Sequence, residues 1–278
     1  MGALRQNQTF RWQMNTDGPE TYEKYIVPVW MADLVPDLLA AGDVDPGKRV
    51  LDAACGTGIV ARNVANRVKP GGRIAALDAN EGMLRVARRC ATEAGAEGIE
   101  WFSGDITRMP FSDGEFDSVL CQQALQFFPD KAGALREMKR ALVPGGRLAL
   151  SVWGRAEMSP HVPVICEVFT KYFGEESTTI FRVACSLCNK ELLHALVQDA
   201  GFSLIRIREG ITIARHPCLA ELLPAYFAGF PVAARIDALP EERRNQLFRD
   251  IMAGLEDYTE NGTLAVPTEH IVLTAENG

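Results

Sequence analysis

Ten residues from Val50 to Ile59, VLDAACGTGI, have the types and spacing of a ligand site. An apolar run ends in an acid, and a Gly-x-Gly turn then opens a helix. A strand of Val, Leu and Ala can be buried on both faces. A turn that brings backbone close to a ligand favours residues without a Cβ, here Gly56 and Gly58. Because the first amides of a helix lack intrahelical partners, they attract electron-rich atoms. The pattern predicts a site for a nucleotide-type cofactor.

The same residues leave two cofactors open. The spacing Gly56-x-Gly58-x-x-Ala61 also satisfies the dinucleotide fingerprint, so an NAD-dependent oxidoreductase is an alternative. Asp52 discriminates between the two, because a carboxylate at the strand end repels a pyrophosphate and attracts a cation. S-adenosylmethionine (SAM) carries a sulfonium and an ammonium group and no phosphate. The sign of the charge therefore favours SAM.

Further motifs follow in a fixed order along the chain. They are LDAACGTG (Leu51 to Gly58), ALDANEGML (Ala76 to Leu84), GDITRMPF (Gly104 to Phe111), FDSVLCQQALQFFPD (Phe116 to Asp130) and LVPGGRLALSVW (Leu142 to Trp153). In these motifs the chain resembles class I SAM-dependent methyltransferases of the ubiquinone/menaquinone-biosynthesis type. The resemblance covers roughly Arg49 to Trp153 and is much weaker outside that block.

The resemblance implies a role for each matching position. The backbone at Gly56 and Gly58 would approach the methionine part of SAM, and Asp52 would bind its ammonium directly or through water. Asp78 would accept both ribose hydroxyls, since a carboxylate offers two acceptor oxygens, although a helix N-cap is the structural alternative. Asp105 would accept from the adenine amino group. The expected cofactor residues are Asp52, Ala53, Cys55, Gly56, Thr57, Gly58, Asp78, Ala79, Asn80, Met83, Gly104, Asp105, Ile106, Gln122, Gln123 and Leu125.

Methyl transfer from a sulfonium is an in-line displacement, so positioning contributes much of the rate and a base is needed only for a protonated nucleophile. The catalytic candidates are His161, Tyr22 and Gln126, the last standing where some small-molecule relatives carry a His. The candidate substrate residues are Tyr25, Trp30, Phe127 and Trp153. We expect an apolar or aromatic small molecule, such as a quinone precursor or polyketide, methylated on oxygen, carbon or nitrogen. No metal site is expected.

Strands and helices alternate as in a doubly wound, mostly parallel sheet. The expected strands are 49–53, 73–78, 99–103, 116–121, 147–153, 203–214 and 270–275, and the last is expected to be antiparallel. The resemblance implies a seven-stranded, Rossmann-like α/β fold with helical lid insertions. We expect an N-terminal lid segment (1–47), a cofactor-binding core (48–153) and a C-terminal part (154–278) with cap insertions near 154–188 and 216–264.

Composition limits the partners. The 278 residues carry a formal net charge of −7, which argues against a nucleic-acid substrate because phosphate binding needs a basic surface. There is no apolar run of membrane-spanning length, and the seven cysteines fit reduced thiols, with Cys185-x-x-Cys188 as the one close pair. We expect a cytoplasmic monomer or homodimer that acts on a small molecule.

Two other classes share these motifs. An enzyme of the same fold can bind SAM without transferring the methyl group, for instance a cyclase that uses the sulfonium electrostatically. A nonenzymatic partner protein that binds the cofactor would also carry them.

Overall fold

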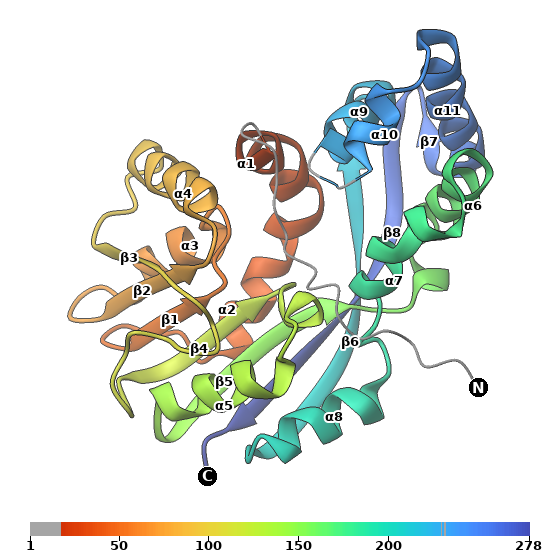
Figure 1. Ribbon diagram of the computed structural model, residues 1–278. Coiled ribbons are helices and arrows are strands. Elements are labelled where there is room, and N and C mark those ends of the chain that lie inside the picture. The colour runs from red at the N-terminus through yellow and green to blue at the C-terminus, as the bar shows by residue number, and fades with distance from the viewer. Residues whose placement is uncertain (1–17, 229, 231) are drawn as a thin grey trace.

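The computed structural model describes residues 18–228, 230 and 232–278 and contains one central sheet flanked by helices (Figure 1). The strands are β1 (Arg49–Ala53), β2 (Arg73–Asp78), β3 (Ile99–Ser103), β4 (Phe116–Gln122), β5 (Leu142–Trp153), β6 (Ser203–His216), β7 (Thr259–Glu260) and β8 (Thr263–Glu276). Most of the expected N-terminal lid segment, 18–47, is described, and its residues 1–17 lie outside the described residues. Within the described ranges, no helix is both long and apolar enough to cross a membrane.

The sheet has the order β3-β2-β1-β4-β5-β8-β6. β1 to β5 run parallel, with Val50 opposite Ile74, and β8 runs antiparallel to both β5 and β6, with His270 opposite Trp153. The predicted α/β fold with an antiparallel last strand is confirmed. The strand number differs from the seven expected, because β7 pairs with the start of β8 across Asn261 and Gly262. Both turn residues have positive φ, 50° and 82°, as a two-residue hairpin requires.

Helices cover both faces of this sheet. They are α1 (Gly18–Thr21), η1 (Tyr22–Met31), η2 (Ala32–Leu34), α2 (Val35–Ala41), α3 (Ile59–Arg67), α4 (Glu81–Glu93), η3 (Leu125–Phe127), α5 (Lys131–Ala141), η4 (Ala156–Met158), α6 (His161–Phe173), η5 (Glu175–Thr178), α7 (Thr179–Ala184), α8 (Lys190–Asp199), α9 (Leu219–Ala228), α10 (Ala233–Asp237), α11 (Glu241–Gly254) and η6 (Glu256–Tyr258). Alternate strand residues divide between two cores: Val50 packs with α2, α3 and α4, whereas Leu51 packs with α5 and α8. This alternation is the doubly wound arrangement.

A third apolar cluster forms a cap beyond the sheet. β6 and β8 extend past their neighbours, and their distal ends, including Ala214 and Val266, pack with η1, α6, α7, α9, α10 and α11. In Figure 1 these helices gather around the upper part of β6 and β8, next to α1. β8 begins at Thr263 instead of near His270. The residues added at the start of β8 include Leu264 and Val266, which pack into the cap.

Candidate functional site

A cavity of about 1080 Å³ lies at the carboxyl ends of β1, β2 and β4, between the sheet and the cap. We call the wall formed by residues 54–124 its core side and the wall formed by the remaining lining residues its cap side. The expected cofactor residues that line the core side are Gly56, Asp78, Ala79, Asn80, Met83, Gly104, Asp105, Ile106, Gln122 and Gln123. A ligand crevice at this edge is where an open α/β sheet places one.

The two turn glycines differ in what they contact. Gly56 lines the cavity at φ 54°, and a Cβ there would meet no atom within 4 Å. Gly58 does not line the cavity, and a Cβ there would lie 2.7 Å from the Trp101 ring. Gly58 also has φ 81°, so its backbone conformation and its packing both require glycine. The structure therefore gives Gly58 a packing role in place of the expected approach to the ligand. Ala54, which sequence reasoning missed, lines the cavity at φ 61°.

Asp78 ends β2 and holds the turn. Its Oδ2 accepts from the Gly56 amide at 2.8 Å and its Oδ1 from the Asn80 amide at 2.8 Å. Burial raises the pKa of Asp78, and these backbone donors counteract the rise. Asn80, not Asp78, is the N-cap of α4, since its Oδ1 accepts from the Gly82 amide at 2.8 Å. Each Asp78 oxygen keeps a lone pair for a ligand in the cavity.

Asp105 lies in the loop after β3. Its Oδ1 accepts from the Thr107 amide and hydroxyl, both at 2.8 Å, and the backbone bond lowers the pKa of Asp105. The side chain is exposed and lines the cavity, next to the buried Ile106. The turn therefore presents a carboxylate at the cavity wall.

Asp52 does not line the cavity, contrary to the expected contact with the ligand ammonium. It is 1% exposed, and its Oδ2 accepts from the Ala61 amide in the first turn of α3 at 2.9 Å. Burial raises the pKa of Asp52 to about 7, with the Asp78 charge adding to the rise. In this structure the Asp52 carboxylate therefore binds the first turn of α3.

Several other expected cofactor residues lie behind the cavity wall. The side chains of Ala53, Cys55, Thr57 and Leu125 are buried and do not line the cavity. Ala53 and Leu125 belong to the apolar core under β1 and β4. Ala53 is turned into the protein by the alternation of strand β1, whereas Cys55, Thr57 and Leu125 are buried from turns and from η3.

Gln126, one of the catalytic candidates, lies behind the cavity wall. It is 1% exposed and absent from the cavity wall, and its Nε2 donates to the Gln123 carbonyl at 3.1 Å. The short η3 turn directs this side chain inward, so it fixes the loop that carries Gln123. That loop is itself constrained, because Gln123 adopts φ 51°.

η1, a π-helix, supplies one edge of the cap side. Tyr22 lines the cavity, and burial together with the Asp78 and Glu23 carboxylates raises its pKa. Tyr25 is not in the wall, because its hydroxyl donates to Glu221 on α9 at 3.2 Å. Tyr25, one of the expected substrate residues, therefore faces α9 and not the cavity.

Aromatic side chains form most of the remaining cap side. The expected Trp30, Phe127 and Trp153 line it, as does His161. The rings of Trp30 and His161 lie 5.9 Å apart between centroids, and burial lowers the pKa of His161 to about 4. At neutral pH the imidazole is therefore uncharged.

Sequence reasoning missed cap residues in the two insertions and on β8. Phe181, Tyr226 and Thr268 line the cavity, and the Tyr226 ring lies 4.8 Å from that of Trp30. Apolar residues at helical spacing indicated helices in this part of the chain, but spacing does not show which face meets the cavity. Thr268 lies on the extension of β8, upstream of the strand start that we expected.

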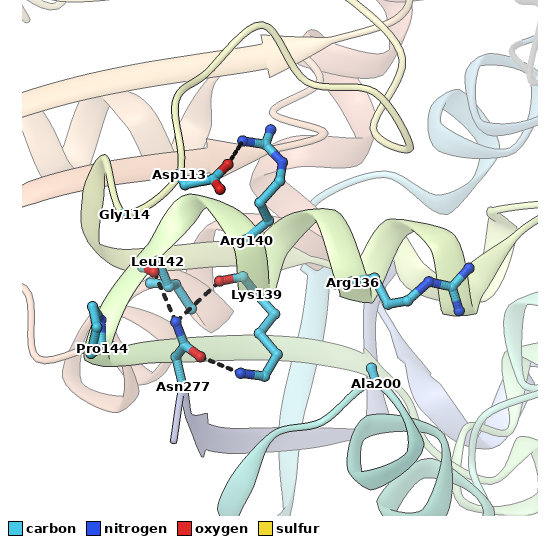
Figure 2. A pocket seen from close by; sticks show the side chains of 9 residues that line it. All are labelled: Asp113, Gly114, Arg136, Lys139, Arg140, Leu142, Pro144, Ala200 and Asn277. Carbon is cyan, nitrogen blue, oxygen red and sulfur yellow. Dashed lines mark hydrogen bonds and ion pairs between the residues drawn. The ribbon is translucent and has the colours of Figure 1, made fainter.

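A second, open pocket of about 520 Å³ lies at the other end of β5 (Figure 2). Asn277 forms part of its wall and donates to the carbonyls of Lys139, at 3.2 Å, and Leu142, at 2.8 Å. Arg140 is engaged there by Asp113 at 2.7 Å. These contacts tie the chain end to the last turn of α5, so we assign the pocket a structural role.

Within residues 18–228, 230 and 232–278, no group of three His, Cys, Asp or Glu side chains is arranged to hold a metal ion. All seven cysteines are free thiols.

Charge decides which cofactor the cavity suits. Asp78, Glu81 and Asp105 line its core side, and no Lys or Arg is among the described residues of its wall. This wall fits a ligand with positive charge and no phosphate, which favours SAM over a dinucleotide.

Comparison with known proteins agrees with this chemistry. Residues 51–150 match the family described as "Methyltransferase domain". Demethylmenaquinone methyltransferase of Listeria monocytogenes serotype 4a is 38% identical over 180 residues, which cover 59% of this chain and 73% of the relative. The chain belongs to the class I SAM-dependent methyltransferases of the ubiquinone/menaquinone-biosynthesis group. A C-methyltransferase of ubiquinone/menaquinone biosynthesis from Ectopseudomonas mendocina is 34% identical over 201 residues, 62% of this chain and 77% of the relative.

Solved structures show the same fold. This methyltransferase matches a Bacillus halodurans protein assigned as a methyltransferase with a TM-score of 0.56 and 21% identity, over 87% of this chain and 98% of that one. It matches Haemonchus contortus phosphoethanolamine N-methyltransferase 2, solved with S-adenosylhomocysteine (SAH), with a TM-score of 0.59 and 20% identity, over 94% and 57%. The enzyme uses SAM, and the predicted oxidoreductase alternative is excluded by its family.

Proposed function

We propose that this methyltransferase methylates a ring carbon of a hydroxylated aromatic metabolite of the reduced-quinone type. The relatives from Listeria and Ectopseudomonas are named for quinone-biosynthesis methylation, which supports this acceptor class. The observation that carries the proposal is the cap side of the cavity, which combines aromatic walls with buried polar atoms that lack partners.

The size of the cavity supports two ligands. Pockets for a single small ligand enclose about 300–1,000 Å³, and this cavity reaches about 1080 Å³. The core side fits SAM, which leaves the cap side for the acceptor. Trp30, Phe181 and Tyr226 give that side flat apolar surfaces, which suit a ring.

Polar atoms on the cap side favour an acceptor that carries oxygen. Trp30 Nε1, Thr268 Oγ1 and His161 Nδ1 are buried without a partner among the described residues. An unmade hydrogen bond of a buried group costs about 1–3 kcal/mol. Ring oxygens of a bound acceptor would offset this cost. A Ser159–Glu269 hydrogen bond of 3.0 Å brings the start of α6 next to Thr268, so these groups converge on one region.

The chain's own residues would orient the two ligands. In this proposal Gly56 and Asp78 hold the methionine and ribose parts of SAM, Asp105 holds its adenine, and Gln122 and Gln123 border the methyl group. SAM supplies an electrophilic methyl group when bound. Uncharged His161 would accept the proton of the ring hydroxyl, which raises electron density at the neighbouring ring carbon. That carbon would take the methyl group as SAH leaves, and loss of the hydrogen it carried, as a proton that passes to solvent with the product, would restore the aromatic ring. The cap excludes water, the competing nucleophile.

The proposal also covers localisation, oligomeric state and partners. We propose a cytoplasmic monomer or homodimer with no nucleic-acid partner. The net charge of −7 and the free thiols support these assignments.

The test is methyl transfer from isotope-labelled SAM to reduced demethylmenaquinone and 1,4-naphthohydroquinone, with naphthalene and phosphoethanolamine as comparison compounds. We expect label on a ring carbon of a hydroquinone, located by mass spectrometry and NMR. Thr268→Val should raise the KM for the hydroquinone several-fold, while Thr274→Val on the same strand, outside the cavity wall, should not. Label on phosphoethanolamine alone, or no transfer to any hydroxylated ring, would overturn the acceptor class.

A further inference from the structure

We infer that Arg62 is a positioning residue that couples closure of the cap to cofactor binding. Arg62 lies on α3 and is 9% exposed. Its Nη1 donates to the Thr57 carbonyl at 2.5 Å, and its Nη2 donates to Glu23 Oε1 at 2.6 Å. One guanidinium therefore joins the Gly-rich turn to η1. Its planar fork presents separate donors in fixed directions to the two acceptors, whereas an ammonium group is a compact charge on a flexible stem.

The turn that Arg62 holds contacts the core side of the cavity. Thr57 follows Gly56, whose amide donates to Asp78 and whose backbone lines the cavity. The bond from Arg62 fixes the Thr57 carbonyl and with it the backbone between Gly56 and Gly58, which both have positive φ. Unusual backbone conformations persist when the surrounding structure holds them. Arg62 itself does not line the cavity, so its effect on a ligand passes through the turn.

The other partner of Arg62 belongs to the cap. Glu23 follows Tyr22, and the same helix delivers Ile26 and Trp30 to the cavity wall. Glu23 Oε2 is buried without a partner among the described residues, so the carboxylate depends on this guanidinium. Since η1 forms part of the wall over the ligand, a shift of the Gly-rich turn is passed to Tyr22 and Trp30 through Arg62.

A second ion pair joins the same segment to the core and provides a matched control. Arg89 on α4 pairs with Glu20 at 2.5 Å, but both side chains are about half exposed, at 45% and 54%. The pair makes no contact with the Gly-rich turn. Exposed pairs contribute little to stability, because water and salt screen them. Both arginines pair with this segment, and of the two only Arg62 also bonds to the Gly-rich turn.

The experiment compares Arg62→Lys, Arg62→Met and Arg89→Met in the full chain, using SAH as the probe. Calorimetry measures the Kd for SAH, and limited trypsin digestion measures the rate of cleavage after Lys24, which is exposed on η1. In the unmodified enzyme we expect SAH to slow cleavage after Lys24. We expect Arg62→Lys to raise the Kd about tenfold and to abolish this protection, with Arg62→Met affected more strongly and Arg89→Met unchanged in both.

The inference is overturned if Arg62→Lys folds and keeps the original Kd and the original protection at Lys24. It is also overturned if Arg89→Met loses protection to the same extent, because the two ion pairs would then only hold the segment in place, without a specific link to the cofactor turn. If both Arg62 variants fail to fold, Glu23→Gln replaces them: it removes the charge but keeps a hydrogen-bond acceptor, and partial loss of protection is expected. No acceptor is used, so failure here is distinct from failure of the proposed acceptor class.

Discussion

The substitution Asp78→Asn tests the core side of the cavity most directly. The side chain keeps its size and one acceptor oxygen, but it loses its charge. In the structure both Asp78 oxygens already accept backbone amides, from Gly56 and Asn80, each at 2.8 Å. The new NH₂ group must face one of these donors, so the turn loses a bond as well as the ligand. Hydrogen bonds to charged groups contribute about 1.5–3 kcal/mol each.

This energy corresponds to a Kd for SAH that is about 10-fold to 150-fold higher, at about 1.4 kcal/mol per factor of ten. Calorimetric titration with SAH measures the change. Asp113→Asn makes the same charge change at an exposed residue of the second pocket and should leave the Kd unaltered. A folded Asp78→Asn protein that binds SAH within twofold of the original affinity would refute the assignment of Asp78 to the cofactor.

Three further predictions follow from the packing and the ionisation of particular residues. Gly58→Ala should lower the free energy of unfolding, measured by urea denaturation, by about 2–4 kcal/mol, because alanine is strained at this positive φ and its Cβ would clash with Trp101. Gly56→Ala has the same backbone strain but open space around the Cβ, so it should lower the free energy of unfolding by only about 1–2 kcal/mol. Equal losses for the two variants would contradict this prediction. Burial lowers the pKa of His161 to about 4, so as the pH falls the unfolded chain binds a proton at this residue before the folded protein does. The free energy of unfolding should therefore decrease by at most about 3 kcal/mol through His161 as the pH falls from about 6.5 to 4. His161→Gln should show a correspondingly weaker acid dependence of the unfolding midpoint, and an identical dependence would exclude a buried neutral imidazole. Tyr25→Phe should leave the Kd for SAH and methyl transfer unchanged, because its hydroxyl meets Glu221 outside the cavity; a large loss of turnover would place Tyr25 at the acceptor.

The core of the sheet could be predicted from the sequence because its signals are local. Apolar runs that end in an acid or a glycine gave the ranges of β1, β2 and β3 as the structure has them. The extensions of β5 and β8 could not be predicted in this way. β8 gains its first residues by pairing with β6 along their length, a contact between segments about fifty residues apart. Long-range pairing of this kind leaves no periodic pattern in either segment alone.

The predicted site residues show the same difference between local and long-range determinants. Positions at the carboxyl ends of strands, such as Asp78 and Gln122, reach the cavity as expected, because the topology of a parallel sheet brings strand ends to one edge. Gln126 was proposed from its position in a motif and Asp52 from its charge at a strand end, and the structure buries both. A motif fixes where the backbone runs. Whether a polar side chain in it faces a ligand or the interior depends on neighbours that are remote in sequence.

The cap explains why the acceptor is harder to assign than the cofactor. The match to the methyltransferase family covers 51–150, which supplies the core side, whereas Tyr226 and Thr268 lie outside it. Residues that hold SAM must meet the same ligand in every relative, so their pattern is shared across the fold. Residues that meet the acceptor answer to a different molecule in each enzyme. Aromatic rings and unpartnered polar atoms in the cap are therefore the evidence specific to this chain, and exchanging them should alter the choice of acceptor while leaving the affinity for SAH intact.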